Sequence, residues 1–246
     1  MRRRILLGSA CALVLARPAV LRARGEDGPV DLLLVLAADV SRSMGEAEIA
    51  LQRDGYAAAL QHPMVVEAIR SGAHAAVAMT YVEWSSWQDQ RVVVPWMRIA
   101  EGVAATAFGS ALREAPPRVG DWTSISGAIR FAQDLLAAAP FEAERRVVDI
   151  SGDGTNNHGG AVEEARDAAV AAGITINGLP ILRAPRHVVG ALPSAEALET
   201  HYREMVVGGA GAFVLPAEGL PAFASAIRRK LVLEIAAPRG DASSAA

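Results

Sequence analysis

The sequence predicts a doubly wound α/β fold, in which a mainly parallel central sheet carries helices on both faces and one antiparallel strand at an edge. Two observations predict it. Short apolar runs alternate along the chain with longer segments of helical periodicity. These runs are continuous, as in residues 30–38 (VDLLLVLAA), so both faces of such strands are expected to be covered. With 246 residues, 52% of them hydrophobic, the chain is long enough to bury a full core.

The predicted elements follow one another from residue 30 without a compositional break. Strands are predicted at residues 30–38, 75–81, 91–96, 146–150, 174–181 and 212–216. Helices are predicted at residues 46–60, 100–115, 124–138, 161–172, 195–206 and 220–235. A short link joins the second and third strands, which suggests a hairpin, and Pro95 places the third strand near an edge. Residues 30–236 are therefore expected to form one domain, followed by a flexible small-residue tail at 237–246.

The first 25 residues have the pattern of a signal peptide. Three arginines at 2–4 precede an uncharged stretch of twelve residues, 5–16, which is too short to span a bilayer as a helix. Small residues at 14–16 and 23–25 offer two cleavage sites. We expect export to the periplasm or the cell exterior, with the general secretory route favoured over the twin-arginine route. The alternative is a retained N-terminal anchor.

Loss of this segment would make the protein acidic. All 27 Asp and Glu lie beyond residue 25, whereas six arginines lie before it, so 18 basic residues remain and the net charge becomes −9. Such a charge argues against nucleic-acid binding. The single cysteine, Cys11, lies in the signal, so the mature chain has no disulfide and no thiolate metal site. The five histidines show no close spacing, which disfavours a zinc site built from them.

Three polar loops lie where an open α/β sheet binds ligands, beyond the carboxyl ends of its strands. The first loop, Asp39–Met44, follows the first strand with the pattern Asp-x-Ser-x-Ser. The second, Asp121–Ser126, contains Thr-Ser-Ile just before a helix. The third, Ser151–Asn157, follows the fourth strand and contains Ser-Gly-Asp-Gly.

Together these motifs resemble the von Willebrand factor type A (vWA) domain and its metal-ion-dependent adhesion site (MIDAS). The resemblance covers about residues 30–235, and the chain looks like a bacterial secreted subgroup of unassigned function. It implies that five residues hold a divalent cation, directly or through water: Asp39, Ser41, Ser43, Thr123 and Asp153. The implied cation is Mg²⁺, with Mn²⁺ or Ca²⁺ as alternatives, and the implied partner is a protein whose acidic side chain completes the coordination.

Elementary chemistry supports this interpretation. Two carboxylates and three hydroxyls form an all-oxygen set, which suits a hard divalent cation. Ser41 and Ser43 alternate along the loop, so both hydroxyls can face one ion. Only two formal negative charges contact the ion, which would stay attractive to an incoming carboxylate. Without an ion, Asp39 and Asp153 are expected to face each other with nothing to neutralise them.

Two other functions stay open. A metal-dependent hydrolase or phosphatase would use Asp39 as nucleophile, but Ser41 stands where a second acid would be expected. The chain also lacks a Gly-x-Ser-x-Gly elbow, a Walker loop and a Gly-x-Gly-x-x-Gly turn, so a non-enzymatic role is favoured. The other alternative is an exported structural protein that uses the metal only for stability.

The sequence does not decide the roles of three further features. Asp149 lies inside a predicted strand, so we expect a buried, hydrogen-bonded role rather than metal ligation. Trp84 and Trp87 fall in the predicted hairpin loop and could contact a partner or pack within the hairpin. Residues 156–158 (Asn-Asn-His) could shape ligand choice, although a plain glycine-rich loop at 154–160 is favoured.

Overall fold

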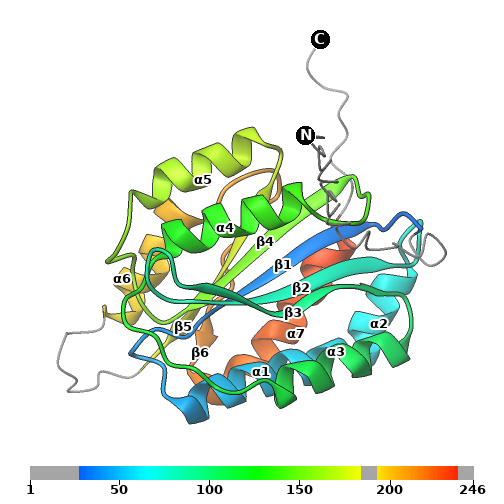
Figure 1. Cartoon of the computed structure of the whole chain (residues 1–246), viewed down its shortest axis with the longest axis horizontal. Helices are drawn as coiled ribbons and strands as arrows, with labels where there is room; N and C mark the ends of the chain where they lie inside the picture. The colour runs from blue at the N-terminus through cyan, green and yellow to red at the C-terminus, as the bar shows by residue number, and fades with distance from the viewer. Residues whose placement is uncertain (1–27, 184–192, 238–246) are drawn as a thin grey trace, which may run out of the picture.

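Six strands form one mixed sheet in the order β3-β2-β1-β4-β5-β6 (Figure 1). The computed structural model describes residues 28–183 and 193–237. All neighbouring strands are parallel except β2 and β3, which are antiparallel at one edge. This confirms the predicted fold class. The strands are β1 (Leu32–Asp39), β2 (Val77–Trp84), β3 (Gln90–Ile99), β4 (Arg145–Gly152), β5 (Thr175–Leu182) and β6 (Ala217–Glu218).

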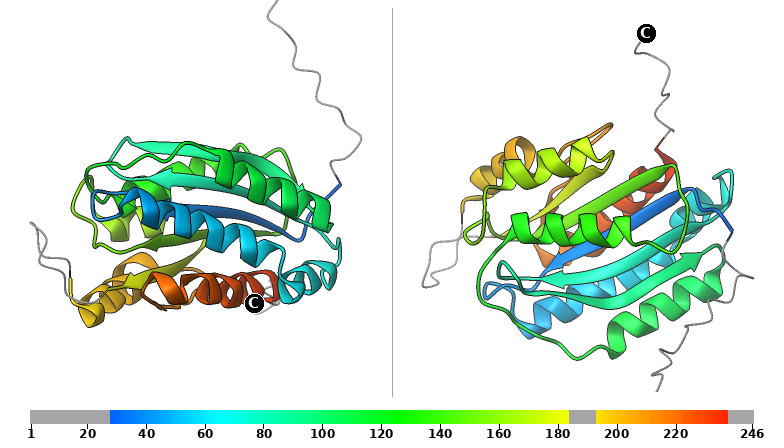
Figure 2. Two further views of the ribbon diagram at one scale, coloured as in Figure 1. Left: turned by 90° about the horizontal axis from the view of Figure 1, so that it is seen from below. Right: turned by 45° about the horizontal axis from the view of Figure 1, so that its top comes forward.

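Helices cover both faces of the sheet (Figure 1). One face carries α1 (Glu46–Leu60), α2 (Pro63–Arg70), α3 (Gly102–Glu114) and α7 (Leu220–Ala236). The other carries α4 (Ile125–Ala137), α5 (Val162–Ala171), α6 (Ala195–His201) and the π-helical turn η1 (Tyr202–Val206). Figure 2 shows α1 lying between α3 and α7 in the view from below.

The continuous apolar run of β1 is explained by these two layers. Leu32, Leu34 and Leu36 are buried on the side of α1, α3 and α7. Leu33 and Val35 are buried on the side of α4 and α5. Burial of each such side chain contributes about 1.5–3 kcal/mol, so β1 forms a fixed base for the polar loop that follows it.

Three element predictions need correction. Residues 212–216 do not form the last strand: Val214 makes an isolated bridge with Gly178, and β6 begins only after Pro216, which has no amide hydrogen to donate to a sheet. The predicted helix at 195–206 changes to η1 at Tyr202. Helix α2 was not predicted; it starts at Pro63, where the missing N–H of proline is harmless.

The predicted signal peptide at 1–25 and most of the predicted tail at 237–246 lie outside the described residues. Within residues 28–183 and 193–237, no helix combines the length and the apolar character needed to cross a bilayer.

Candidate metal centre

The three polar loops meet at the carboxyl edge of the sheet. Asp39 is the last residue of β1, and Asp153 follows the last residue of β4, the parallel neighbour of β1. Thr123 precedes α4, and its loop is held against the first loop by a hydrogen bond from the Gly120 amide to the Val40 carbonyl (2.7 Å). All five residues predicted to bind a cation are therefore brought to one place.

The side-chain oxygens of four of these residues form a continuous chain of contacts, and the fifth, Asp39, is linked to it through the Ser41 amide. The Thr123 hydroxyl donates to Ser41 Oγ at 3.3 Å, and Ser41 Oγ lies 3.2 Å from Ser43 Oγ. Ser43 Oγ donates to Asp153 Oδ1 at 2.6 Å. The Ser41 amide donates to Asp39 Oδ1 at 2.7 Å, which fixes the Asp39 carboxylate at the end of the cluster.

Both carboxylates are buried, with 0% of Asp39 and 2% of Asp153 exposed. Burial and, next, the negative charge of Asp153 raise the pKa of Asp39 to about 8. Burial also raises the pKa of Asp153, although Arg183 acts against this rise. Asp39 Oδ2 has no hydrogen-bond partner among the described residues. A buried carboxylate oxygen without a partner costs free energy, and a bound cation would remove that cost.

Glycines leave room beside these oxygens. A Cβ atom at Gly152 would lie 2.8 Å from Asp39 Oδ2, and one at Gly154 would lie 3.2 Å from Thr123 Oγ1. No cluster of three or more His, Cys, Asp or Glu able to hold a metal occurs in the part of the chain that the structure describes. A cation here would therefore depend on hydroxyls as well as carboxylates, and the two carboxylates and three hydroxyls present fit a hard divalent ion.

Arg183 is a charged neighbour of the site that the sequence analysis missed. It follows β5, and its Nε lies 2.9 Å from Asp153 Oδ2. The expectation that nothing neutralises Asp39 and Asp153 was therefore wrong for Asp153. For Asp39 no cationic partner is found within the described ranges. Arg183 stands at the carboxyl end of a strand, the same signal that selected the other loops, but an arginine is not a metal ligand and no motif includes it.

Tyr202 is a second residue that the sequence analysis missed. Its hydroxyl is buried and has no hydrogen-bond partner among residues 28–183 and 193–237. The point where a Gly152 Cβ would lie is 3.0 Å from this hydroxyl and 2.8 Å from Asp39 Oδ2, so both oxygens border the same space. Burial holds the pKa of Tyr202 well above its ordinary value, and the hydroxyl stays a neutral donor. It is presented by the π-helical turn η1, a conformation that is frequent at functional sites.

Residues 156–158 are tied to the site rather than forming a plain glycine-rich loop. The Asn157 side chain accepts from the Thr123 amide, and the Asn157 amide donates to the Thr123 carbonyl, both at 2.9 Å. Asn156 Oδ1 accepts from the Ser126 amide at 3.1 Å, in the first turn of α4. These contacts set the position of Thr123, one of the five predicted ligands.

The tryptophan side chains near the site differ in how far they are buried. Trp84 ends β2 and is fully buried, so it packs in the core. Trp87 is partly buried, with the Arg130 guanidinium 5.8 Å from its ring centroid. Trp122, next to Thr123, is 54% exposed and stacks on His158. The exposed aromatic side chain beside the site is therefore Trp122, which the sequence analysis did not single out.

Asp149 is not part of this cluster. It is fully buried, its Oδ1 lies 2.6 Å from Lys230 Nζ of α7, and its Oδ2 accepts from the Tyr56 hydroxyl at 3.4 Å. These partners give it the buried, hydrogen-bonded role that was expected.

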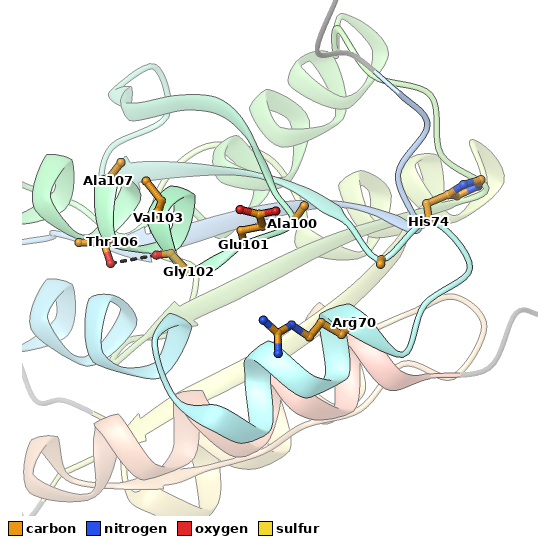
Figure 3. A pocket seen from close by; sticks show the side chains of 9 residues that line it. Arg70, His74, Ala100, Glu101, Gly102, Val103, Thr106 and Ala107 are labelled. Carbon is orange, nitrogen blue, oxygen red and sulfur yellow. Dashed lines mark hydrogen bonds between the residues drawn. The ribbon is translucent and has the colours of Figure 1, made fainter.

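A separate open cavity of about 1110 Å³ lies at the other end of the strands from the oxygen cluster (Figure 3). Arg70, at the end of α2, faces the first turn of α3 across it, and Glu101 and Val103 belong to its lining. It lies near the end of β3 and the start of β2, away from the oxygen cluster.

The architecture is the fold seen in vWA domains. A vWA structure from Catenulispora acidiphila superposes with a TM-score of 0.58 at 14% identity, covering 84% of this chain and 43% of that one. The pilus adhesin SpaC from Lactobacillus rhamnosus GG gives a TM-score of 0.61 at 14% identity, covering 85% of this chain and 31% of that one. Proximal thread matrix protein 1 from the mussel byssus, with a zinc-occupied MIDAS motif, gives 0.58 at 16% identity, covering 85% of this chain and 49% of that one.

These identities show a shared fold alone, and this chain spans less than half the length of each of the three structures. The chain itself belongs to the family described as "Protein of unknown function (DUF1194)", which it matches over residues 29–239. No curated protein sequence matches it.

Proposed function

We propose that this chain is an exported vWA module that binds a protein partner through a divalent cation, with a carboxylate of the partner completing the coordination. The proposed ligands are Asp39, Ser41, Ser43, Thr123 and Asp153. The observation that carries the proposal is Asp39 Oδ2, a buried carboxylate oxygen that has no partner among the described residues. The other oxygen of this carboxylate accepts from Ser41, whose hydroxyl clusters with those of Ser43 and Thr123.

The residues divide the work of holding the ion. Asp39 and Asp153 supply the negative charge, and the hydroxyls of Ser41, Ser43 and Thr123 supply neutral oxygens. When bound, the cation supplies a positive centre that attracts an anionic oxygen of the ligand. Because the protein contributes only two carboxylates, the ion keeps its attraction for a third one.

The donor set favours Mg²⁺, Mn²⁺ or Ca²⁺, which prefer oxygen ligands. Zinc also has to be tested, because the mussel protein carries it in a MIDAS motif. The wide spacing of the histidines argues only against a zinc site built from histidine and leaves an all-oxygen site open.

Two observations support a protein partner outside the cytoplasm. SpaC, which shares the fold, is a pilus adhesin. Trp122 exposes its ring next to Thr123, where a ligand that reaches the ion would meet it. Aromatic side chains of this kind are enriched in protein interfaces. The predicted signal peptide at 1–25 would deliver the module to the periplasm or the cell surface.

Calorimetric titration of Mg²⁺, Mn²⁺, Ca²⁺ and Zn²⁺ tests the proposal. The wild type should bind at least one of these ions, and Asp39→Ala should lose that binding while keeping its circular dichroism spectrum. Asp121→Ala is the matched control, because Asp121 is an exposed acid of the neighbouring loop that pairs with Arg42. Equal binding by wild type and Asp39→Ala would contradict the proposed site.

A pull-down from a periplasmic extract, with and without the ion that binds, separates partner capture from a purely structural use of metal. The proposal expects one protein to be captured by wild type with the ion and lost with Asp39→Ala. An ion that raises the melting temperature but leaves capture unchanged would favour the structural alternative.

A further inference from the structure

The Arg183 guanidinium is fixed against two of the proposed ligands. Its side chain is 7% exposed, and its Nε lies 2.9 Å from Asp153 Oδ2. Its Nη1 donates to the Ser43 carbonyl at 3.4 Å, and its Nη2 lies 2.8 Å from Met44 Sδ. The guanidinium therefore joins the end of β5 to the loops that carry Ser43 and Asp153.

Glu48 holds the other side of the guanidinium. Its Oε1 lies 2.7 Å from Arg183 Nη1, and its Oε2 accepts from the Gly45 amide at 2.9 Å, at the start of α1. Arg183 is thus held between an acid of the proposed metal site and an acid that caps a helix. Because arginine stays protonated in proteins, its positive charge is permanent.

This arrangement places a fixed positive charge where a second, divalent positive charge would bind. The charges are shielded from solvent, so neither salt nor water screens their repulsion well. A free cation at Asp39 and Asp153 meets a site in which Arg183 already pairs with one of the two carboxylates. An arriving carboxylate adds negative charge that both cations attract.

We propose that the fixed positive charge of Arg183 weakens the binding of a divalent ion on its own, so that the ion binds tightly only together with an acidic ligand. The inference rests on the proposed function, and it assigns Arg183 a positioning and regulatory role rather than a ligand role. It also explains how the fold tolerates Asp153 when no ion is bound. The ion and the ligand then bind cooperatively, each raising the affinity for the other.

Titration of Mn²⁺ alone into purified variants tests the first half of the inference. Arg183→Gln should bind Mn²⁺ about tenfold more tightly than wild type, because a fixed like charge is removed. Arg183→Lys keeps the charge and should stay near the wild-type affinity. Arg42→Gln is the matched control, since it removes an exposed arginine from the Asp39–Ser43 loop and should leave Mn²⁺ affinity unchanged.

Two further variants isolate the effect. Arg183→Gln combined with Glu48→Gln should retain most of the tightening, because the released Glu48 charge is then absent as well. Arg183→Met removes the same charge and serves if Arg183→Gln does not fold, as judged by circular dichroism.

Repeating the Mn²⁺ titration with excess acetate, a minimal carboxylate, tests the second half. Acetate should tighten Mn²⁺ binding to wild type by a larger factor than to Arg183→Gln, an effect that a merely structural Arg183 would not produce. Equal or weaker Mn²⁺ binding by the folded charge-free variants, or an equal acetate effect, would overturn the inference and leave the metal site standing. No binding of Mg²⁺, Mn²⁺, Ca²⁺ or Zn²⁺ by either wild type or Arg183→Gln would overturn the proposed function, and the inference with it.

Discussion

Two pairs of buried carboxylates stand close to strand β4, one between the sheet and α7 and the other at the carboxyl edge of the sheet. Asp149 and Glu234 make up the interior pair, and Asp39 and Asp153 make up the edge pair. At most 2% of any of these four residues is exposed. Each pair also has one buried basic side chain. The two pairs nevertheless differ in how their oxygens are used.

In the interior pair one cation serves both acids. Lys230 Nζ lies 2.6 Å from Asp149 Oδ1 and also pairs with Glu234, while Asn177 donates to Glu234 Oε1 at 2.9 Å. Burial still raises the pKa of Asp149 to about 7, against the lowering effect of Lys230. Lys230, Asn177 and Tyr56 contact three of the four carboxylate oxygens, while Glu234 Oε2 has no hydrogen-bond partner among the described residues. The pair therefore behaves as an internal ion pair that fixes α7 on the sheet.

In the edge pair the cation reaches only one acid. Arg183 contacts Asp153. Asp39 has no cationic partner within the described residues, and its own Oδ2 has no hydrogen-bond partner there. Hydroxyl oxygens can donate to a carboxylate and can also ligate a cation. Because both pairs contain two acids and one buried cation, buried acids alone do not mark a metal site. The three clustered hydroxyls of Ser41, Ser43 and Thr123 distinguish the edge pair.

The largest change in the free energy of unfolding is expected from a substitution that breaks the interior pair. Lys230→Met should lower the free energy of unfolding by about 3–5 kcal/mol, because two acids lose the one cation that serves both. Urea denaturation measures this loss, and adding a divalent ion should not restore it. A loss below about 1 kcal/mol would mean that Lys230 does not hold the pair.

A smaller and opposite effect is expected at the edge. Asp39→Asn should raise the free energy of unfolding of the metal-free protein by about 1 kcal/mol. It removes a carboxyl whose ionisation is opposed by burial, which raises its pKa to about 8, and it keeps an acceptor for the Ser41 amide. The same variant should show no rise in melting temperature with Mn²⁺. Thermal melts with and without Mn²⁺ measure both. If Asp39→Asn destabilises the metal-free protein, the edge carboxylate is already well compensated.

Asn157→Ala sharpens the role of the loop at the edge. It should weaken Mn²⁺ binding by about tenfold, since Thr123 loses the side chain that accepts from its amide. The cost in stability should be only about 0.5–1.5 kcal/mol, the net value of one hydrogen bond. Calorimetry measures the Mn²⁺ affinity and urea denaturation measures the stability. An unchanged Mn²⁺ affinity would show that Asn157 has no role in metal binding.

The smallest effect concerns pH. Burial lowers the pKa of His201 below its ordinary value of 6.5, and its Nε2 accepts from the Asn156 amide at 3.3 Å. The folded protein therefore binds this proton less readily than the unfolded chain does. The stability from this contact is present above pH 6.5 and falls as the pH drops below that value. Hydrogen exchange at Asn156 should become faster at pH 5.5 than at pH 7.5, after correction for the intrinsic exchange rates. His201→Gln should remove that difference. The same pH dependence of Asn156 exchange in both proteins would contradict the role given to His201.

The sequence was most informative where a local pattern decides the structure. The apolar run of β1, the helix at Glu46–Leu60 and the edge position of β3 could be predicted because periodicity and Pro95 are local signals. Asp39 and Asp153 could be predicted to meet because parallel strands end at one edge of a sheet. The choice of Ser41, Ser43 and Thr123 beside them came from the resemblance to the vWA domain.

The missed features depend on contacts between distant residues. The pairing of Arg183 with Asp153 depends on the register of β5 beside β4. The Tyr202 hydroxyl borders the same space as Asp39 Oδ2 because of a π-helical turn, which the sequence periodicity does not predict. Lys230 lies 81 positions from Asp149 in the chain, so only the packing of α7 on the sheet reveals the partner. The cation itself stays a prediction.

Crystals grown with Mn²⁺ and measured for anomalous scattering test the central claim most directly. The account predicts one strong peak at the carboxyl edge, within coordination distance of oxygens from Asp39, Ser41, Ser43, Thr123 or Asp153, either directly or through a bound water. It also predicts no peak beside Asp149 and Glu234, where Lys230 already supplies the positive charge. A peak at the interior pair, or no peak at the edge in protein that binds Mn²⁺ in solution, would contradict the account.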